Sequence, residues 1–386
     1  MTQVFPASDR PSHLPALDGL RGVAILLVIA THTASGLFGA LSIYEDPADK
    51  GHSLQLSPWL DAVASYGYHG VTLFFVVSAF TLTRQMRGAG PYDLRRYALR
   101  RIFRVGPGYW LAGLAYFALL GSSARDGVPA GYTGLDLLSG FTFTGLFVSP
   151  AAVSVVPGGW SVQVEVAFYA LLPLVLWVTR RRAVFMAGLT ITAIIAAQVF
   201  MRHAALAGFW SYPLYTTPPI QLPVFLAGMT AGLLRPERWR IGRAEALVPA
   251  AAVALLAAAI LVVPFSPLAG WRMLLHVQFA MLAAGATLLA AWHPPRLLTS
   301  AALTSIGTVS YSMYLIHFVL LWPFYAAMHR LLPAGGALAF GLTLAAVTAS
   351  ADALARLSYR WIEQPPRRWI AAPLAARRAV TVPALP

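Results

Sequence analysis

Long apolar stretches recur along this chain, and many of them are interrupted by hardly a charged side chain. A helix needs roughly 20 apolar residues to cross the hydrocarbon core of a bilayer. Only 11% of the residues are charged and 58% are hydrophobic, whereas a soluble domain carries about 25% charged residues. The chain is therefore predicted to be an all-α, polytopic transmembrane helix bundle.

The apolar stretches divide the chain into a short N-terminal segment at 1–16, a membrane domain at 17–370 and a tail at 371–386 that is expected to be disordered. No cleavage site follows the first stretch, which indicates a retained helix. The stretches give about ten predicted spans. They lie at 20–40, 68–86, 105–120, 162–179, 184–201, 215–234, 246–264, 272–292, 303–326 and 337–356.

Basic residues are distributed unevenly between alternate loops. If the N-terminus is cytoplasmic, 23 of the 28 lysine and arginine residues fall on the cytoplasmic side. Basic loops stay on that side in membrane proteins, so both termini are predicted to be cytoplasmic. The same asymmetry explains the net charge of +14. No basic stretch lies in a recognisable binding module, so no nucleic-acid partner is expected.

Ionisable side chains inside a span are costly, which makes each one a candidate site residue. Arg21 and His32 share the first predicted span. Eleven residues at about 100° each bring both side chains to one stripe of the helix, roughly 16 Å apart along its axis. His32, predicted near the membrane midplane, could act as a general base on a hydroxyl group. Alternatively, it could be hydrogen-bonded to a neighbouring helix as part of the packing.

Glu165 and His317 are two further ionisable candidates. Glu165 begins the fourth predicted span, where a desolvated carboxylate is expected to be ion-paired or to share a proton. It could orient a histidine, contact sugar hydroxyls or neutralise an arginine. His317 reaches a depth similar to that of His32. No carboxylate is paired with the two histidines by spacing, so packing is favoured for His317 and no metal is expected.

A basic cluster at 95–104 leads into the third predicted span. Arg101 and Arg104, three residues apart, share a helix face and could clamp phosphate groups from the cytoplasmic side. Topology signalling alone would also explain the cluster. Asp352 and Arg356 are expected to form an ion pair. The other histidines, His69 and His276 among them, lie in loops or at span ends and are expected to be mostly solvated or interfacial. The chain has no cysteine, which excludes a thiol nucleophile.

Six segments, taken in order, resemble the membrane acyltransferase 3 family, and the resemblance covers most of the chain. Ala79 stands where that family usually has glycine, and Gly106 and Gly108 stand where bulkier residues are usual. Neither departure removes one of the ionisable side chains named above as candidate site residues. The matching segments are Leu17–Gly22 followed by His32, Gly70–Phe80, Arg100–Trp110, Trp160–Tyr169, Ser310–His317 and Arg360–Trp369.

The resemblance implies that acyl-CoA, commonly acetyl-CoA, donates an acyl group to a hydroxyl of a carbohydrate or a glycosylated small molecule. Cell-surface polysaccharide, a lipid-linked sugar and a macrolide sugar are all compatible acceptors. It also implies a multi-pass protein of a bacterial-type inner (plasma) membrane whose membrane domain itself engages the acceptor, because no extracellular esterase domain is expected. His32 would be the general base or a transient acyl carrier.

The resemblance further distributes roles among the residues of the matching segments. The expected roles are as follows: catalytic, His32, Glu165 and Arg21; donor-binding, Arg100, Arg101, Arg104 and Tyr109; acceptor-binding, Trp160, Ser161, Tyr169 and His317. Two alternatives remain open. A membrane transporter for a glycolipid or small metabolite would explain the spans and buried charges, and a non-catalytic membrane scaffold would tolerate the loss of His32, Glu165 and Arg101 alike.

Overall fold

The computed structural model describes residues 14–34, 66–87, 93–122, 131–206, 216–234 and 275–366, and every regular element among them is helical. The all-helical prediction is therefore confirmed for this part of the chain. The predicted span at 246–264 and the predicted tail at 371–386 lie outside the described residues, as do residues 1–13 of the predicted N-terminal segment.

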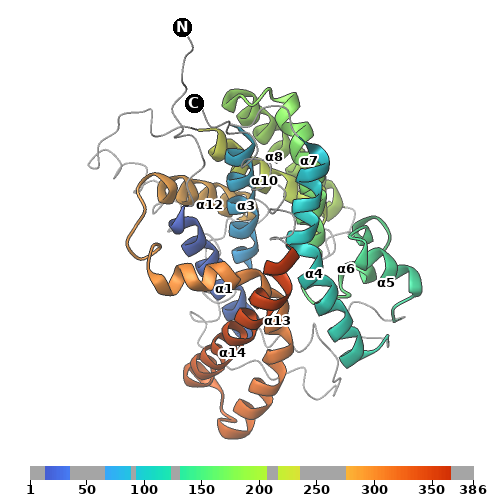
Figure 1. Ribbon diagram of the computed structural model, residues 1–386, viewed down its shortest axis with the longest axis vertical. Helices are drawn as coiled ribbons and strands as arrows, with labels where there is room; N and C mark the ends of the chain where they lie inside the picture. Colours follow the sequence, from blue (N-terminus) through green and yellow to red (C-terminus); the bar gives the residue numbers. More distant parts are fainter. Residues whose placement is uncertain are drawn as a thin grey trace, which may run out of the picture. The chain divides into compact units, whose positions relative to one another are not determined.

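The long helices coincide with the other predicted spans (Figure 1). Within the described ranges, five helical segments are long and apolar enough to cross a membrane: Pro15–Ala34, Gly159–Val178, Ala183–Phe200, Ala301–Leu331 and Gly336–Pro366. The chain is thus a membrane protein with several apolar helices, and the full set of ten spans stays a prediction. The long helices are α1 (Pro15–Ala34), α3 (Gly70–Arg87), α4 (Leu94–Leu120), α7 (Gly159–Val178), α8 (Ala183–Leu206), α10 (Pro218–Leu233), α12 (Leu275–Trp292), α13 (Ala301–Leu331) and α14 (Gly336–Ser358).

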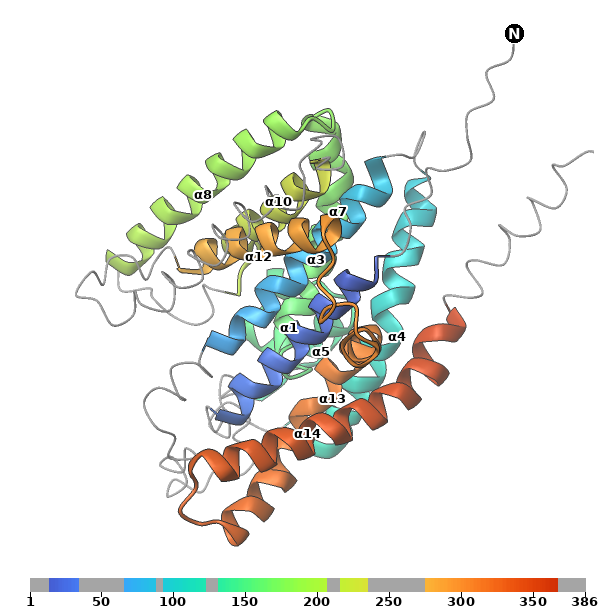
Figure 2. The same cartoon turned by 90° about the vertical axis from the view of Figure 1, so that its left-hand side faces the viewer.

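The chain divides into two compact units. The first unit comprises residues 1–31, 62–91 and 171–308, and the second comprises 32–61, 92–170 and 309–386. In the first unit α10 packs against α3, α8 and α12 (Figures 1 and 2). Gly228 allows the close approach of α10 to α3, because a Cβ atom there would lie 2.6 Å from the carbonyl oxygen of Val76.

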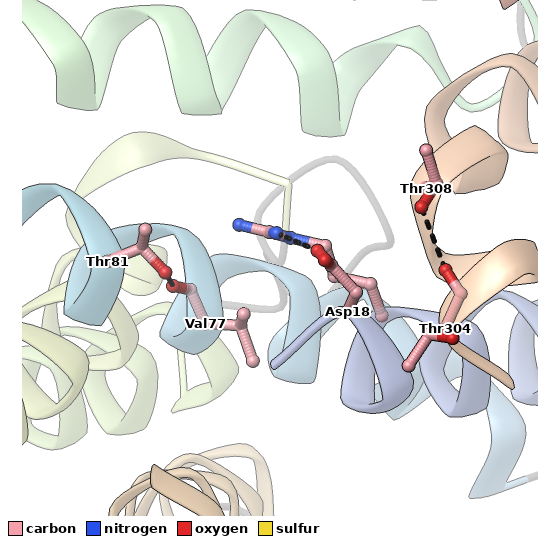
Figure 3. Close-up of polar contacts among 6 residues, drawn as sticks. Asp18, Val77, Thr81, Thr304 and Thr308 are labelled. Carbon is pink, nitrogen blue, oxygen red and sulfur yellow. Dashed lines mark hydrogen bonds and ion pairs between the residues drawn. The ribbon is translucent and has the colours of Figure 1, made fainter. Parts of the chain in front are cut away.

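Threonine hydroxyls inside helices of the first unit donate back to carbonyl oxygens one turn earlier. Thr81 donates to Val77 over 2.7 Å and Thr308 donates to Thr304 over 2.8 Å (Figure 3). A hydroxyl that finds its partner within its own helix leaves no unsatisfied polar group in an apolar environment. This arrangement lets these polar residues occupy otherwise apolar helices.

Two histidines of the first unit contradict the expectation that they are solvated. His69, in the short 3-10 helix η2 (Tyr66–His69), is 4% exposed, and His276 at the start of α12 is 5% exposed. The ring of His69 stacks on Phe279 with centroids 3.6 Å apart. Aromatic stacking of η2 on α12 therefore contributes to the burial of His69, whose position at the end of an apolar stretch had suggested contact with water or the interface.

In the second unit the first half of α7 runs antiparallel to α4, and the second half of α13 runs parallel to α4. The hydroxyl of Tyr97 donates to the carbonyl of Tyr169 over 3.0 Å, whereas Tyr109, further along α4, contacts Gln163, earlier on α7. Tyr311 and then Leu315 of α13 contact successively later positions of α4 through hydrogen bonds to Val105 and Tyr116. The three helices thus meet over several turns.

Between α4 and α7, residues 131–158 contain the short elements α5 (Gly134–Phe141), η3 (Gly145–Phe147) and α6 (Pro150–Val153). At the C-terminal end, α14 continues into a short π-helical segment, η7 (Tyr359–Glu363). The predicted ion pair on α14 is confirmed, because Arg356 donates to Asp352 over 2.7 Å and 2.9 Å.

Candidate active site

A pair of histidines brings together α1 and α13 in the second unit. Nδ1 of His32 lies 3.0 Å from Nε2 of His317, although the two residues are 285 positions apart in the sequence. Their rings are stacked, with centroids 5.2 Å apart. His317 is fully buried and His32 is half-buried. The sequence predicted both residues as candidates at similar depth, and the structure places them in direct contact.

Phe318 and Tyr314 enclose this histidine pair. The ring of Phe318 lies 4.6 Å from that of His32 and 4.1 Å from that of His317, measured between centroids. Tyr314 donates its hydroxyl to the carbonyl of Gly158 over 2.9 Å and accepts from Ser161 over 2.8 Å. The start of α7 and the residue before it therefore hold Tyr314, one of the side chains beside the histidines. Ser161, predicted to bind the acceptor, is one of the residues that hold it.

Arg101 lies on α4 between two tyrosine rings. Its guanidinium is 5.9 Å from the ring centroid of Tyr97 and 5.8 Å from that of Tyr169. Its Nε is buried and makes no hydrogen bond with the described residues. Burial lowers the pKa of the Arg101 guanidinium, while Tyr169 acts in the opposite direction. A buried guanidinium nitrogen without a hydrogen-bond partner is costly, so this position favours the binding of an anion beside the charge of Glu165.

Tyr97 completes this arginine cluster. Burial raises the pKa of its phenol to about 12, so the hydroxyl stays protonated at neutral pH and donates to the carbonyl of Tyr169. The ring is thereby held in place under Arg101. Tyr97 belongs to the basic stretch of the sequence, but its role was not predicted, because nothing in the spacing showed that α7 would lie against it.

Glu165 belongs to the arginine cluster rather than to the histidine pair. It accepts a hydrogen bond of 2.7 Å from the hydroxyl of Tyr169, and its charge acts on Arg101. Among the described residues no hydrogen bond or ion pair joins Glu165 to His32, whose polar contact is His317. Of the predicted alternatives, neutralising an arginine and contacting an acceptor both fit this position. Glu165 is one turn from Ser161 on α7, which links the two clusters.

Arg21 is engaged by a neighbour on its own helix. It donates to Asp18, which is labelled in Figure 3, over 2.8 Å. The two side chains are 18% and 13% exposed. Arg21 belongs to the first unit, whereas His32 belongs to the second, and helix α1 contains both. His32 lies in the last turn of α1, while the predicted span of 20–40 had placed it near the middle. Residues 35–40 lie outside the described part of the chain.

The remaining predicted site residues occupy different environments. Arg100 is exposed and Arg104 is half-buried on α4. Tyr109 is completely buried, and its hydroxyl accepts from Nε2 of Gln163 over 3.3 Å. Trp160 is 8% exposed at the start of α7. The burial of Tyr109 and Trp160 favours packing roles for both, and their predicted contacts with substrates stay predictions.

A buried carboxylate near the end of α14 was missed by the sequence analysis. Glu363 in η7 is 1% exposed and accepts a hydrogen bond from Ser312, which also bonds to Ser358 over 3.0 Å. The sequence could have indicated this carboxylate, because Glu363 is a lone acidic residue between Ile362 and Gln364 in a segment that otherwise carries only basic charges. Within the described residues, no cluster of three or more histidine, aspartate or glutamate side chains could hold a metal ion.

Comparison with known proteins assigns the chain to a family. The profile of the acyltransferase domain matches residues 14–356. The chain is 27% identical over 342 residues to BcsY from Komagataeibacter xylinus, whose name describes a membrane-bound transacylase, and the match covers 83% of this chain and 74% of BcsY. It is 26% identical over 377 residues to the acyltransferase MdmB from Streptomyces mycarofaciens, covering 90% of this chain and 88% of MdmB. No solved structure shows a significant match.

This chain belongs to the acyltransferase family described by that domain. It is a membrane enzyme that transfers acyl groups, as the resemblance of the sequence segments implied. The transporter and scaffold alternatives lose their support with this assignment.

Proposed function

We propose that this enzyme moves an acyl group from acyl-CoA, with acetyl-CoA as the expected donor, to a hydroxyl group of a carbohydrate or a glycosylated small molecule. The observation that carries the proposal is the contact between His32 and His317, in the same unit as a buried Nε of Arg101 that has no hydrogen-bond partner in the described part of the chain. A neutral imidazole is suited to remove a proton from a hydroxyl group. A guanidinium whose Nε makes no hydrogen bond with the described residues is suited to hold an anionic donor.

Arg101 and Arg104 bind the phosphate groups of the donor in this proposal. They share a face of α4 at a spacing of three residues. The two tyrosine rings beside Arg101 fix its side chain before the donor arrives, so less conformational freedom is lost on binding. Arg100 is exposed and contributes charge around the site rather than a fixed contact.

His32 removes the proton of the acceptor hydroxyl as its oxygen attacks the carbonyl carbon of the thioester. The bond between carbon and sulfur then breaks, and the thiolate of CoA leaves with the proton that His32 had accepted. Such general-base assistance contributes typically about 10²- to 10⁴-fold to the rate. Glu165, half-buried and one turn from Ser161 on α7, is suited to hydrogen-bond the hydroxyls of the acceptor, whereas the hydroxyl of Ser161 is buried against Tyr314.

The membrane arrangement that we propose has both termini in the cytoplasm of a bacterial-type cell, about ten spans in its inner membrane, and the donor-binding arginines at the cytoplasmic face. Two observations support it. The basic residues follow the positive-inside rule. The directions of α4, α7 and α13 in the second unit also agree with the order of the predicted spans, since the third and ninth spans would run outward and the fourth inward.

Complementation of a deletion strain tests this proposal. Mass spectrometry of glycans and glycosylated metabolites is expected to show an acyl group in cells with the wild-type protein. Its mass identifies donor and acceptor together. His32→Ala should abolish that product. Purified Arg101→Ala should raise the KM for acyl-CoA about 10- to 100-fold, the loss expected for hydrogen bonds to a charged group.

Arg95→Ala is the matched control, because Arg95 is an exposed arginine on the same helix. This variant should leave the KM unchanged. Full turnover by a folded His32→Ala protein would contradict the assignment of the base. Transport of a substrate without consumption of thioester would instead favour the transporter.

A further inference from the structure

The hydrogen bonds of His317 determine which of its nitrogens carries a proton. Its Nδ1 lies 2.8 Å from the carbonyl oxygen of Tyr314 and 3.2 Å from that of Met313. A carbonyl oxygen only accepts hydrogen bonds, so Nδ1 must donate. A neutral imidazole carries a single proton, which leaves a lone pair on Nε2 of His317. Both carbonyls belong to the preceding turn of α13, so the backbone of the helix enforces this tautomer.

The lone pair of His317 in turn determines the tautomer of His32. Nε2 of His317 lies 3.0 Å from Nδ1 of His32 and can only accept, so Nδ1 of His32 must be the donor. The single proton of a neutral His32 therefore sits on Nδ1, and its Nε2 has a free lone pair. Nε2 makes no hydrogen bond with the residues that the structure describes. It is the atom of the pair that is able to accept a proton.

We propose that His317 is a positioning residue that presents Nε2 of His32 as the proton acceptor of the reaction, rather than an acceptor-binding residue as the sequence suggested. The inference rests on the proposed function for its consequence in catalysis. His317 acts entirely through His32, and its full burial behind the rings of Phe318 and Tyr314 leaves it no place beside a substrate.

The pair also accommodates the charge that develops during transfer. When Nε2 of His32 takes the proton of the acceptor hydroxyl, the imidazolium keeps its Nδ1–H directed at Nε2 of His317. Oxygen–carbon bond formation, carbon–sulfur cleavage and return of the proton to the CoA thiolate then restore the neutral pair. Two backbone carbonyls anchor His317 during this cycle. His317 accepts from Nδ1 of His32, as the carboxylate of a Ser-His-Asp triad accepts from Nδ1 of the catalytic histidine.

Solid-state NMR of the wild-type protein in lipid, with 15N-labelled histidine, tests the tautomer directly. The signal of His32 is identified by its loss in His32→Gln. We expect a protonated Nδ1 and an unprotonated Nε2 for His32. A proton on Nε2 would overturn the inference. This measurement needs no substrate and no turnover, so its result is independent of whether acyl-CoA is the donor.

Two variants then separate positioning from binding. His317→Gln keeps an amide oxygen that can accept from His32, whereas His317→Leu removes the acceptor. We expect His317→Leu to lower kcat by about 10²-fold with little change in KM, and His317→Gln to restore much of the rate. His329→Leu, an exposed position on the same helix, is the control. A rise in KM at unchanged kcat would assign His317 to substrate binding and overturn the proposal. Turnover that survives in His32→Ala would overturn the proposed function while the tautomer result still stood.

Discussion

Gly158 leaves room for two of the side chains that lie against the histidine pair, Tyr314 and Phe318. Its φ is +71°, a conformation that residues with a Cβ atom rarely adopt. A Cβ atom at this position would lie 2.7 Å from the hydroxyl oxygen of Tyr314 and 2.9 Å from the ring of Phe318. Both side chains contact the histidines, so a substitution here acts on the site without touching a reacting atom.

Gly158→Ala should therefore lower both stability and activity. The left-handed backbone costs roughly 1–2 kcal/mol for a residue with a Cβ atom, and displacement of a catalytic group by about 1 Å can cost about 10²-fold in rate. Thermal unfolding and acyl-transfer rates of the purified variant measure the two effects. Gly188→Ala is the control, because nothing lies within 4 Å of a Cβ atom at that helical position. Unchanged activity in a stable Gly158→Ala protein would contradict the proposed role of Tyr314 and Phe318 in placing the histidines.

The sequence predicted individual site residues better than it predicted their partners. His32, His317, Arg101 and Glu165 stand out because ionisable groups are costly in apolar helices. Their contacts depend on which helices pack together, and a separation of 285 residues between the two histidines carries no signal about that packing. The contacts of Glu165 were unpredictable for the same reason: it accepts from Tyr169 and its charge acts on Arg101 of α4, and its role toward His32 or the acceptor stays a prediction.

At the scale of elements, apolar length predicted most helices, while polar networks determine the connections between them. The segment after α4 has only a short apolar stretch, which did not predict its structure, yet it contains α5 and α6. Asp136 links the two. It accepts from Thr133 at the start of α5 and from Ser149 at the start of α6. Serine and threonine caps of this kind are visible in a sequence only once the helix positions are known.

The stability of this connection should depend on pH. Hydrogen bonds, from Ser149 first and then from Thr133, hold the pKa of the Asp136 carboxyl below its ordinary value of 3.8. A depressed pKa means that the ionised form stabilises the fold above the pKa of the unfolded chain, about 3.9, and that this stabilisation is lost as the pH falls through the folded value. Asp136→Asn should therefore lower the melting temperature at pH 7 and approach the wild type below pH 4.

Ser149→Ala provides a second variant for the same measurement, since it removes the first of the two donors without removing the charge. It should show a smaller loss at pH 7 and keep part of the pH dependence. Equal melting temperatures for wild type and Asp136→Asn across the whole pH range would show that the network contributes nothing to stability.

At the scale of the whole molecule, the alternation of helix direction connects the sequence to the proposed chemistry. In the first unit Phe225 and Gly228 of α10 contact Phe75 and Val76 of α3 in the same order, so these two helices run in the same direction. The predicted topology assigns both to inward spans. This agreement is informative because the two observations are independent. Loop charge determines the orientation in which a span is inserted, whereas helix packing determines which spans lie side by side in the folded protein.

Cysteine labelling provides a direct test of the orientation, because the chain contains no cysteine of its own. Thr299 and Ala334 are exposed and lie just beyond opposite ends of α13, a helix of 31 residues that at about 1.5 Å per residue exceeds the thickness of the hydrocarbon core. A membrane-impermeant maleimide should label Ala334→Cys in intact cells. It should label Thr299→Cys only after the membrane is opened, because Thr299 follows Arg296 in a segment predicted to be cytoplasmic.

The reverse pattern would place the arginines of α4 that we propose to bind the donor on the outer face, where acyl-CoA is not available, and would remove the support for that donor while leaving the histidine pair intact. Labelling of both variants in intact cells would mean that α13 does not cross the membrane. Since α4 and α13 run in the same direction within the second unit, the orientation measured for α13 also fixes that of the arginine cluster, and with it the side of the membrane from which the donor must approach.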